Sequence, residues 1–338
     1  MTRFKLIHMD TLSCEPIARR MPNGDLLTIC QCGDVKEPAP LNRVYAFRSK
    51  DEGQTWSPKE LVYPEDGQAV YNTEVMVLND EVTLFLTLHN GYFDDWKCVM
   101  MKSYDSGYTW VNAGPPPYLD SYTFVRGQIT LKNGAILIPY QQYPLTREQR
   151  EWLKINKTYV WKSGVKTVRA GVIISYDGGK TFEKGGAIDI SLERGWIWPE
   201  PTIVELSNGA ITMLLRMDGA GYLYRSDSFD GGKSWTEPIK TDIPNPNNKV
   251  KLLKFNDGRI ALLHTPNSSL QGLRSRNPLS VWISNDDLKS WYYKKDLTDF
   301  DGCFSYPDGF ITSDQKHIMF TVDFNRHDIY FVDHEIEE

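Results

Sequence analysis

The chain has 338 residues, a formal net charge of -6 at pH 7, and 10 Trp and 18 Tyr residues. The negative charge and the lack of a basic run argue against a nucleic-acid-binding surface. No apolar run approaches the roughly 18 residues that a membrane-spanning helix needs. The first ten residues also lack the apolar core of a signal peptide, so the sequence predicts a cytoplasmic location.

One short sequence motif, S-x-D-x-G-x-(T/S)-(W/F), recurs five times along the chain. The copies lie at residues 49–56, 103–110, 175–182, 228–235 and 284–291, the last with Leu288 in place of Gly. The Asp carboxylate can accept hydrogen bonds from its own turn, Gly tolerates a positive φ, and the aromatic ring fills space between strands. Successive Asp residues are 54, 72, 53 and 56 residues apart, which is the period of a four-stranded propeller blade.

A second repeat, a hairpin turn followed by an apolar strand, alternates with the first. It is clear at residues 22–27, 131–134, 206–209 and 255–258, and weaker at 78–80 and 312–314. Asn-Gly and Asp-Gly pairs between apolar runs are strong hairpin signals. The two repeats together predict an all-β fold, a six-bladed β-propeller of four-stranded antiparallel blades that spans residues 1–338 as one domain.

The two ends of the chain are both strand-like, at residues 4–9 and 328–332. We expect them to pair in one blade, because this closes the ring and covers strand edges that would otherwise be exposed.

Residues 146–166 interrupt the period and lengthen the third interval. They contain a stretch, residues 147–154, that predicts a short amphipathic helix. The segment is either a surface decoration or, given Trp152 and Trp161, a lid or a subunit contact. The oligomeric state stays open.

The five Cys residues lack the paired spacing of a metal site, and no nucleotide-binding motif is present. The sequence therefore predicts no cofactor and no metal.

Functional groups in a propeller gather where the innermost strands begin, around the central axis. Counting back nine residues from each hairpin turn selects Glu15, Tyr71, Val125, Glu200, Lys249 and Tyr306. We expect the two Glu and the two Tyr side chains to converge on one cavity. Glu74, Arg126 and Gln128 are expected to line the same cavity and to set its specificity.

The segment from Glu200 through a strand and a hairpin turn to Arg216 resembles the sialidase superfamily, in particular its bacterial predicted neuraminidases built from Asp-box (BNR) repeats. In that family such a Glu serves a catalytic Tyr as base, and such an Arg holds the substrate carboxylate. The resemblance extends over essentially the whole chain. It implies that Tyr306, in Ser305-Tyr306-Pro307, is the catalytic Tyr.

The same resemblance implies roles for four further residues. Arg276 matches the position of a further carboxylate-binding Arg, and Arg326 lies in a tail similar to that of the family. The loop at residues 32–37 resembles one that carries an acidic residue, so either Glu37 or Asp34 takes the acid/base role.

A Tyr nucleophile paired with Glu suits a substrate whose own carboxylate would repel a carboxylate nucleophile. Sialidases place an Arg on the first inner strand, where this chain has Cys14 followed by Glu15. We therefore expect an exo-acting glycoside hydrolase whose carbohydrate substrate is an acidic or modified sugar rather than ordinary sialic acid.

Two other functions fit the same sequence. One is a lyase acting on a uronate-containing oligosaccharide, with His89 or His264 as the base. The other is a propeller that binds glycans or proteins without catalysis, because a fold can outlast the activity it once carried.

Overall fold

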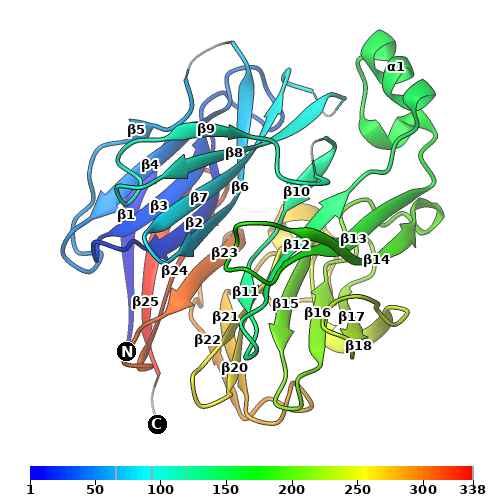
Figure 1. Cartoon of the computed structure of the whole chain (residues 1–338). Coiled ribbons are helices and arrows are strands. Elements are labelled where there is room, and N and C mark those ends of the chain that lie inside the picture. The colour runs from blue at the N-terminus through cyan, green and yellow to red at the C-terminus, as the bar shows by residue number, and fades with distance from the viewer. Residues whose placement is uncertain (65–66, 93, 120, 337–338) are drawn as a thin grey trace.

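The computed structural model describes residues 1–64, 67–92, 94–119 and 121–336. Its strands form six antiparallel sheets that follow one another around a ring, which confirms the predicted six-bladed propeller (Figure 1). Among the helices in these residues, none is long and apolar enough to cross a membrane.

The first three blades take up the N-terminal half of the ring. Blade 1 consists of β2 (Ser13–Arg20), β3 (Leu26–Cys32), β4 (Arg43–Ser49) and β5 (Glu60–Leu61). Blade 2 consists of β6 (Ala69–Leu78), β7 (Glu81–His89), β8 (Trp96–Ser103) and β9 (Val111–Gly114). Blade 3 consists of β10 (Thr123–Val125), β11 (Ile129–Thr130), β12 (Ile136–Gln142), β13 (Thr167–Ser175) and β14 (Glu183–Ser191). Its inner strand is broken, so that β10 and β11 both pair with β12.

The other three blades complete the ring. Blade 4 consists of β15 (Pro201–Glu205), β16 (Ile211–Leu215), β17 (Tyr222–Ser228) and β18 (Ile239–Pro244). Blade 5 consists of β19 (Lys251–Lys254), β20 (Ile260–His264), β21 (Ser280–Ser284) and β22 (Tyr293–Asp296). Blade 6 consists of β23 (Phe304–Ile311), β24 (His317–Phe324), β25 (Asp328–Glu335) and the N-terminal β1 (Thr2–Met9).

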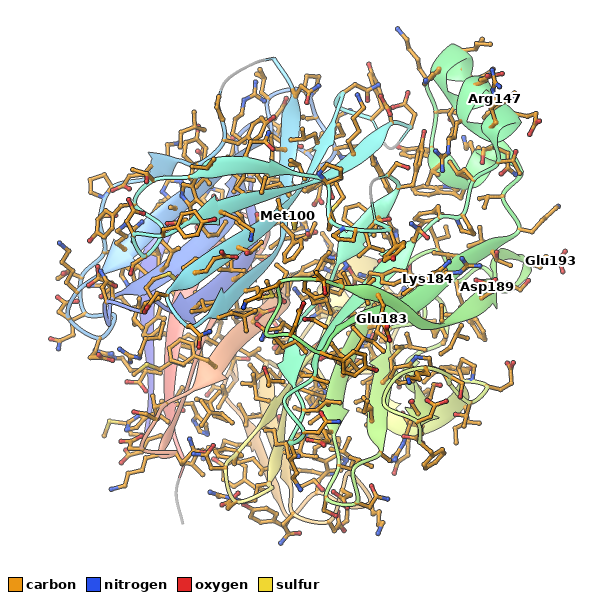
Figure 2. All side chains as sticks on the ribbon, in the orientation of Figure 1. Met100, Arg147, Glu183, Lys184, Asp189 and Glu193 are labelled. Atoms are coloured by element: carbon orange, nitrogen blue, oxygen red, sulfur yellow. The ribbon has the colours of Figure 1, made fainter. Side chains whose placement is uncertain are left out.

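Each blade buries its middle strands and exposes its outer strand. In blade 3, β13 is almost wholly buried, whereas β14 alternates between buried Ile188 and Ile190 and exposed charged residues. Figure 2 shows Glu183, Lys184 and Asp189 on this outer strand. The hydrophobic core therefore lies between neighbouring blades, where sheet faces pack on each other.

The five Asp-containing motifs are called Asp turns below. In each of them the Asp carboxylate accepts hydrogen bonds from its own turn, as predicted. In the first, Asp51 accepts hydrogen bonds from the backbone N–H of Thr55 at 2.8 Å and from its hydroxyl at 2.6 Å. The Ser49 hydroxyl accepts from the backbone N–H of Gly53, whose φ is 77°. Leu288 takes the place of this Gly in the fifth turn and adopts a φ of 65°, so the turn geometry is kept even without Gly.

The chain ends meet as predicted. β1 pairs with β25 in antiparallel register from Thr2 opposite His334 to Met9 opposite Asp328. This pairing makes the N-terminal strand the outer strand of the last blade and closes the ring (Figure 1).

The insertion forms α1 (Arg147–Asn156) followed by the 3₁₀ turn η1 (Val160–Ser163), which confirms the predicted helix. Thr146 and Gln149 form a reciprocal capping box at the start of α1. Leu153 is its buried residue, while Arg147 projects from the edge of the molecule (Figure 2). Two further 3₁₀ turns are η2 (Leu192–Arg194) and η3 (Gly272–Ser275).

Three inner strands are irregular near their starts, at the same end of the ring. β2 shifts register between Cys14 and Ile17, β6 between Asn72 and Glu74, and β23 between Ser305 and Asp308. Within these bulges Glu15 has a φ of 53° and Tyr306 a φ of 58°. Positive φ is uncommon for such residues, and strain of this kind often marks a functional site.

Candidate functional site

A cavity of about 160 Å³ opens at the end of the ring where the inner strands begin. Five blades contribute its lining residues, which are Glu15, Glu37, Tyr71, Phe124, Arg126, Trp198, Glu200 and Tyr306. The structure thus brings together the two Glu and the two Tyr residues selected by counting back from the hairpin turns. Val125 is not among the lining residues, because its neighbours Phe124 and Arg126 face the cavity instead.

Tyr306 is buried at the start of β23, and its hydroxyl accepts a hydrogen bond of 3.1 Å from Arg216 Nη1. Its backbone N–H is directed at Asn248 Oδ1, at 3.3 Å. Burial raises the pKa of Tyr306 well above its ordinary value, and the nearby negative charge of Glu200 raises it further, against the opposing effect of Arg216. The resting side chain is therefore the neutral phenol.

Glu200 precedes β15 and is held by two Arg residues. Its Oε1 lies 2.9 Å from Arg126 Nη2, and its Oε2 lies 2.7 Å from Arg216 Nη1. Burial alone would raise the pKa of Glu200, but the positive charges of Arg216, Arg126 and Lys249 outweigh it and lower the pKa. Within the described part of the chain no hydrogen bond joins Glu200 to Tyr306, and Arg216 Nη1 contacts both.

Three guanidinium groups surround the Tyr306 ring. Besides Arg216, the Cζ atoms of Arg276 and Arg326 lie 5.5 and 5.7 Å from the ring centroid. Arg276 donates hydrogen bonds to Ser305 Oγ at 2.9 Å and to the carbonyl oxygen of Asn247 at 2.7 Å. Among the described residues Arg276 has no carboxylate partner, whereas Arg216 also pairs with Asp218 at 2.8 Å.

The two candidate acids, Glu37 and Asp34, lie in different places in the structure. Glu37 lines the cavity and forms an ion pair with Arg326. Asp34 does not line it. Its carboxylate accepts a hydrogen bond from the backbone N–H of Val35 at 2.7 Å, within its own loop.

The first inner strand places Cys14 and Glu15 side by side but in different surroundings. Cys14 is fully buried, which raises the pKa of its thiol to about 12. Glu15 reaches the cavity, where its Oε2 lies 3.8 Å from Arg126 Nη1. Arg326 comes from the turn between β24 and β25 and is anchored beside this strand, because its carbonyl oxygen accepts a hydrogen bond from the Ser13 N–H.

Glu74 and Gln128 do not line the cavity, which corrects the prediction made for them. Glu74 is directed into a buried cluster on the propeller axis, where it pairs with Arg19 and Lys251. The bulge in β6 after Asn72 changes which residues face the axis. Gln128 lies half-buried between β10 and β11, at the break in the inner strand.

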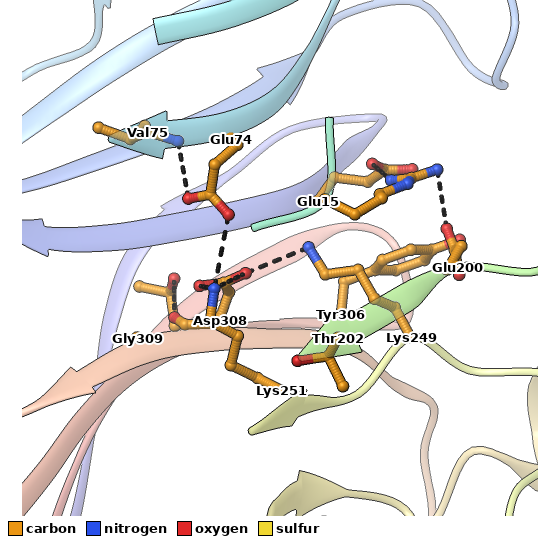
Figure 3. Close-up of polar contacts among 12 residues, drawn as sticks. Glu15, Glu74, Val75, Glu200, Thr202, Lys249, Lys251, Tyr306, Asp308 and Gly309 are labelled. Atoms are coloured by element: carbon orange, nitrogen blue, oxygen red, sulfur yellow. Dashed lines mark hydrogen bonds and ion pairs between the residues drawn. The ribbon is translucent and has the colours of Figure 1, made fainter. Parts of the chain in front are cut away.

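The axis cluster consists of Arg19, Glu74, Lys249, Lys251 and Asp308. The fully buried Asp308 carboxylate pairs with Arg19 at 2.7 Å, Lys251 at 3.1 Å and Lys249 at 3.2 Å. Figure 3 shows both Lys residues converging on Asp308, with Tyr306 beside them. Lys249 Nζ lies 5.9 Å from the Tyr306 ring centroid, so the cluster adjoins the cavity at Tyr306. Sequence reasoning selected Lys249 but missed Asp308, which lies only two residues after Tyr306.

The aromatic wall was also missed. Phe124 and Trp198 line the cavity together with Tyr71, and Trp198 lies two residues before Glu200 in a Trp-rich segment. The two His residues considered as bases lie outside the lining. His89 stacks on Tyr71 at 4.6 Å, and His264 packs against Trp282. Burial lowers the pKa of each His to about 3.

Across the described residues, no group of three or more His, Cys, Asp or Glu side chains is placed to hold a metal ion. The cavity itself contains the phenols of Tyr71 and Tyr306, three carboxylates and the Arg126 guanidinium.

The fold agrees with comparisons to known proteins. A family model of a BNR repeat-like domain matches residues 43–318. The chain therefore belongs to the BNR-repeat family of the sialidase superfamily.

Among curated proteins, a sialidase of Clostridium perfringens is 26% identical over 312 residues, covering 80% of this chain and 76% of the relative. Among solved structures, a protein of unknown function from Dyadobacter fermentans has a TM-score of 0.75 at 18% identity, and 99% of each chain is covered. The Hadza microbial sialidase Hz136 has a TM-score of 0.70 at 17% identity, covering 97% of this chain and 66% of that one.

Proposed function

We propose that the protein is an exo-acting glycoside hydrolase that removes a terminal sugar carrying a carboxylate. The observation that carries this proposal is Arg276, a buried guanidinium beside Tyr306 that meets only neutral acceptors among the described residues. Asp323 and Asp218 lie close enough for the charge of Arg276 to act on their pKa values, but neither forms an ion pair with it. A planar carboxylate is the natural partner of an Arg fork. Arg326, 5.7 Å from the same ring, would serve as the second contact.

The size of the cavity supports attack at a chain end. Its volume of about 160 Å³ is smaller than the roughly 300–1,000 Å³ typical of sites that enclose drug-sized ligands. Such a cavity suits one sugar residue, and Tyr71, Phe124 and Trp198 offer the apolar faces on which a pyranose ring packs.

In the proposed mechanism Tyr306 Oη attacks the anomeric carbon while Glu200 accepts the phenol proton. Glu37 protonates the glycosidic oxygen as that bond breaks, and a covalent sugar–Tyr intermediate forms. A water molecule then attacks the anomeric carbon while Glu37 takes a proton from that water. The bond from the sugar to Tyr306 Oη breaks, and Glu200 returns its proton to this oxygen, which restores the phenol. Two displacements retain the anomeric configuration.

The ion pair between Glu37 and Arg326 suggests how the acid becomes protonated. A guanidinium paired with a carboxylate favours the ionised form of that carboxylate, and Arg326 pairs with Glu37 in this way. A substrate carboxylate that binds Arg326 takes over this positive charge. Glu37 is then free to take up the proton that it donates to the leaving group.

Product analysis tests the proposal on a panel of sialosides, uronosides and neutral glycosides. We expect release of a free acidic sugar, and we expect Tyr306→Phe to lower kcat by at least about 10³-fold, because the nucleophile is lost. Tyr140→Phe is the matched control, since Tyr140 is equally buried but lies outside the cavity. Turnover of the panel by Tyr306→Phe at the wild-type rate, or cleavage of neutral glycosides alone, would overturn the proposal.

The lyase alternative has a distinct product, because elimination leaves a double bond that absorbs in the ultraviolet. Neither His lines the cavity, and burial lowers the pKa of both, so the geometry does not favour the lyase.

A further inference from the structure

A second cavity, of about 210 Å³, adjoins the first and shares Glu37 with it. Three segments build it: the loop after β3, the loop after β7 and the stretch that follows α1. The side chains used in the argument below are Lys36, Glu37, Tyr92, Lys157 and Tyr159.

If Glu37 is the acid, the second cavity lies close to the glycosidic bond that is cleaved. An acid that protonates a glycosidic oxygen lies between the sugar that is cleaved off and the residue that leaves. Glu37 lines both cavities, so a sugar cleaved in the first would leave its partner residue near the second.

The wall of the second cavity offers aromatic faces. Tyr159 is 43% exposed and Tyr92 is 52% exposed. Tyr159 stacks on Trp161 at 4.7 Å with an interplanar angle of 6°, and Trp161 meets Trp198 of the first cavity edge-on at 5.9 Å. The Tyr159 ring is thus held in place by contacts that run from one cavity to the other. Exposed, oriented aromatic rings of this kind suit the apolar face of a sugar.

The charge of the second cavity is positive. Lys36 and Lys157 both line it, and neither forms an ion pair with any described residue, while the negative charge of Glu37 is compensated by Arg326. Lys157 is held at the C-cap of α1 with a φ of 44°, so the helix orients its backbone. Two uncompensated ammonium groups beside a stacking platform favour a sugar that carries an anionic group.

We infer that the second cavity is the leaving-group subsite and that it binds a sugar residue bearing a negative charge. This inference rests on the proposed function and narrows its substrate to oligosaccharides with at least two acidic residues. The insertion at residues 146–166 is then a substrate-binding element rather than a decoration.

Binding to the Tyr306→Phe variant tests the subsite without turnover. Isothermal titration would compare two acidic disaccharides, digalacturonate and α2,8-linked disialic acid, with galacturonate and sialic acid. We expect one disaccharide to bind at least about tenfold more tightly than its own monosaccharide, because both cavities are filled. If neither disaccharide binds more tightly than its own monosaccharide, the inference is wrong.

Second-site substitutions make the test specific. Tyr159→Ala and Lys157→Gln should each remove most of the gain for the disaccharide and leave monosaccharide binding unchanged. The matched control is Tyr176→Ala, since Tyr176 is 57% exposed but lies in an Asp turn at the opposite end of blade 3. Equal weakening of monosaccharide and disaccharide, or no weakening, would contradict the assignment.

The two proposals can fail separately. Cleavage of an aryl glycoside with no disaccharide preference would retain the hydrolase and reject the subsite. A Tyr159-dependent disaccharide preference in a wild-type protein that cleaves nothing would reject the hydrolase and leave the cavity as a second sugar-binding site.

Discussion

Asp308 shows how much a single buried carboxylate can organise. Its side chain is fully buried, yet burial, which would raise its pKa, is outweighed by Arg19, Lys251 and Lys249, which hold the pKa far below the ordinary value. These partners come from blades 1 and 5, while Asp308 belongs to blade 6. One residue therefore joins three blades at the axis, beside Tyr306 (Figure 3).

Asp308→Asn should lower the free energy of unfolding by about 3–5 kcal/mol, because it leaves three buried cations without a central counter-charge. Asp189→Asn is the control, since Asp189 pairs with Arg169 on the exposed face of β14 and should change stability by less than about 1 kcal/mol. Urea unfolding of both variants would measure the difference. Equal losses of unfolding free energy in the two variants would show that the cluster stabilises the fold no more than a surface ion pair does.

At the scale of the element, the Asp turn is the structural motif that repeats. In Asp51, Asp177, Asp230 and Asp286 the pKa is lowered from 3.8 to about 2, first by a hydrogen bond from the Thr or Ser hydroxyl four residues later. The Asp is therefore a better acceptor when ionised, and each turn is tighter above the unfolded-state pKa.

This lowering predicts a loss of stability in acid. A carboxyl with a folded pKa below its unfolded value stabilises the fold above about pH 4, and the contribution disappears as pH falls through about 2. The thermal midpoint of the wild type should therefore drop between pH 4 and pH 2. A double variant, Asp177→Asn with Asp286→Asn, should be less stable at pH 7 and show a shallower drop. Parallel curves for the two proteins would disprove the role of these carboxylates.

At the scale of the whole molecule, closure of the ring by β1 holds the site together. The cavity draws on five blades, so any opening of the ring would separate its residues. β1 joins the last blade through seven antiparallel residue pairs between Thr2 and Met9, with a register shift between Leu6 and His8. The N-terminus is also fixed to Glu335 by an ion pair of 3.3 Å.

Removal of residues 1–9 should expose the edge of β25, lower the thermal midpoint by at least about 5 °C and promote aggregation. A synthetic peptide of residues 1–9 should restore part of the loss, because the strand can pair in trans. Differential scanning calorimetry with and without the peptide would measure both effects. A truncated chain that melts like the full one would mean that the ring is closed by other contacts.

Much of this architecture follows from the sequence alone, because the signals are local. Blade number, hairpins and Asp turns depend on residues within a few positions of each other, and the end-to-end pairing follows from a ring that must close. The alignment of Glu15, Tyr71, Glu200 and Tyr306 could be predicted for the same reason, since each stands at one place in a repeated unit.

Only the tertiary structure decided which side chains share a cavity. The bulge in β6 directs Glu74 to the axis cluster, and loop conformation places Glu37, not Asp34, at the cavity beside Arg326. The second cavity joins loops from blades 1 and 2 with the insertion in blade 3, segments more than 50 residues apart in the chain. Side-chain direction at a bulge and contacts between blades depend on packing across the whole ring, which no local pattern in the sequence records.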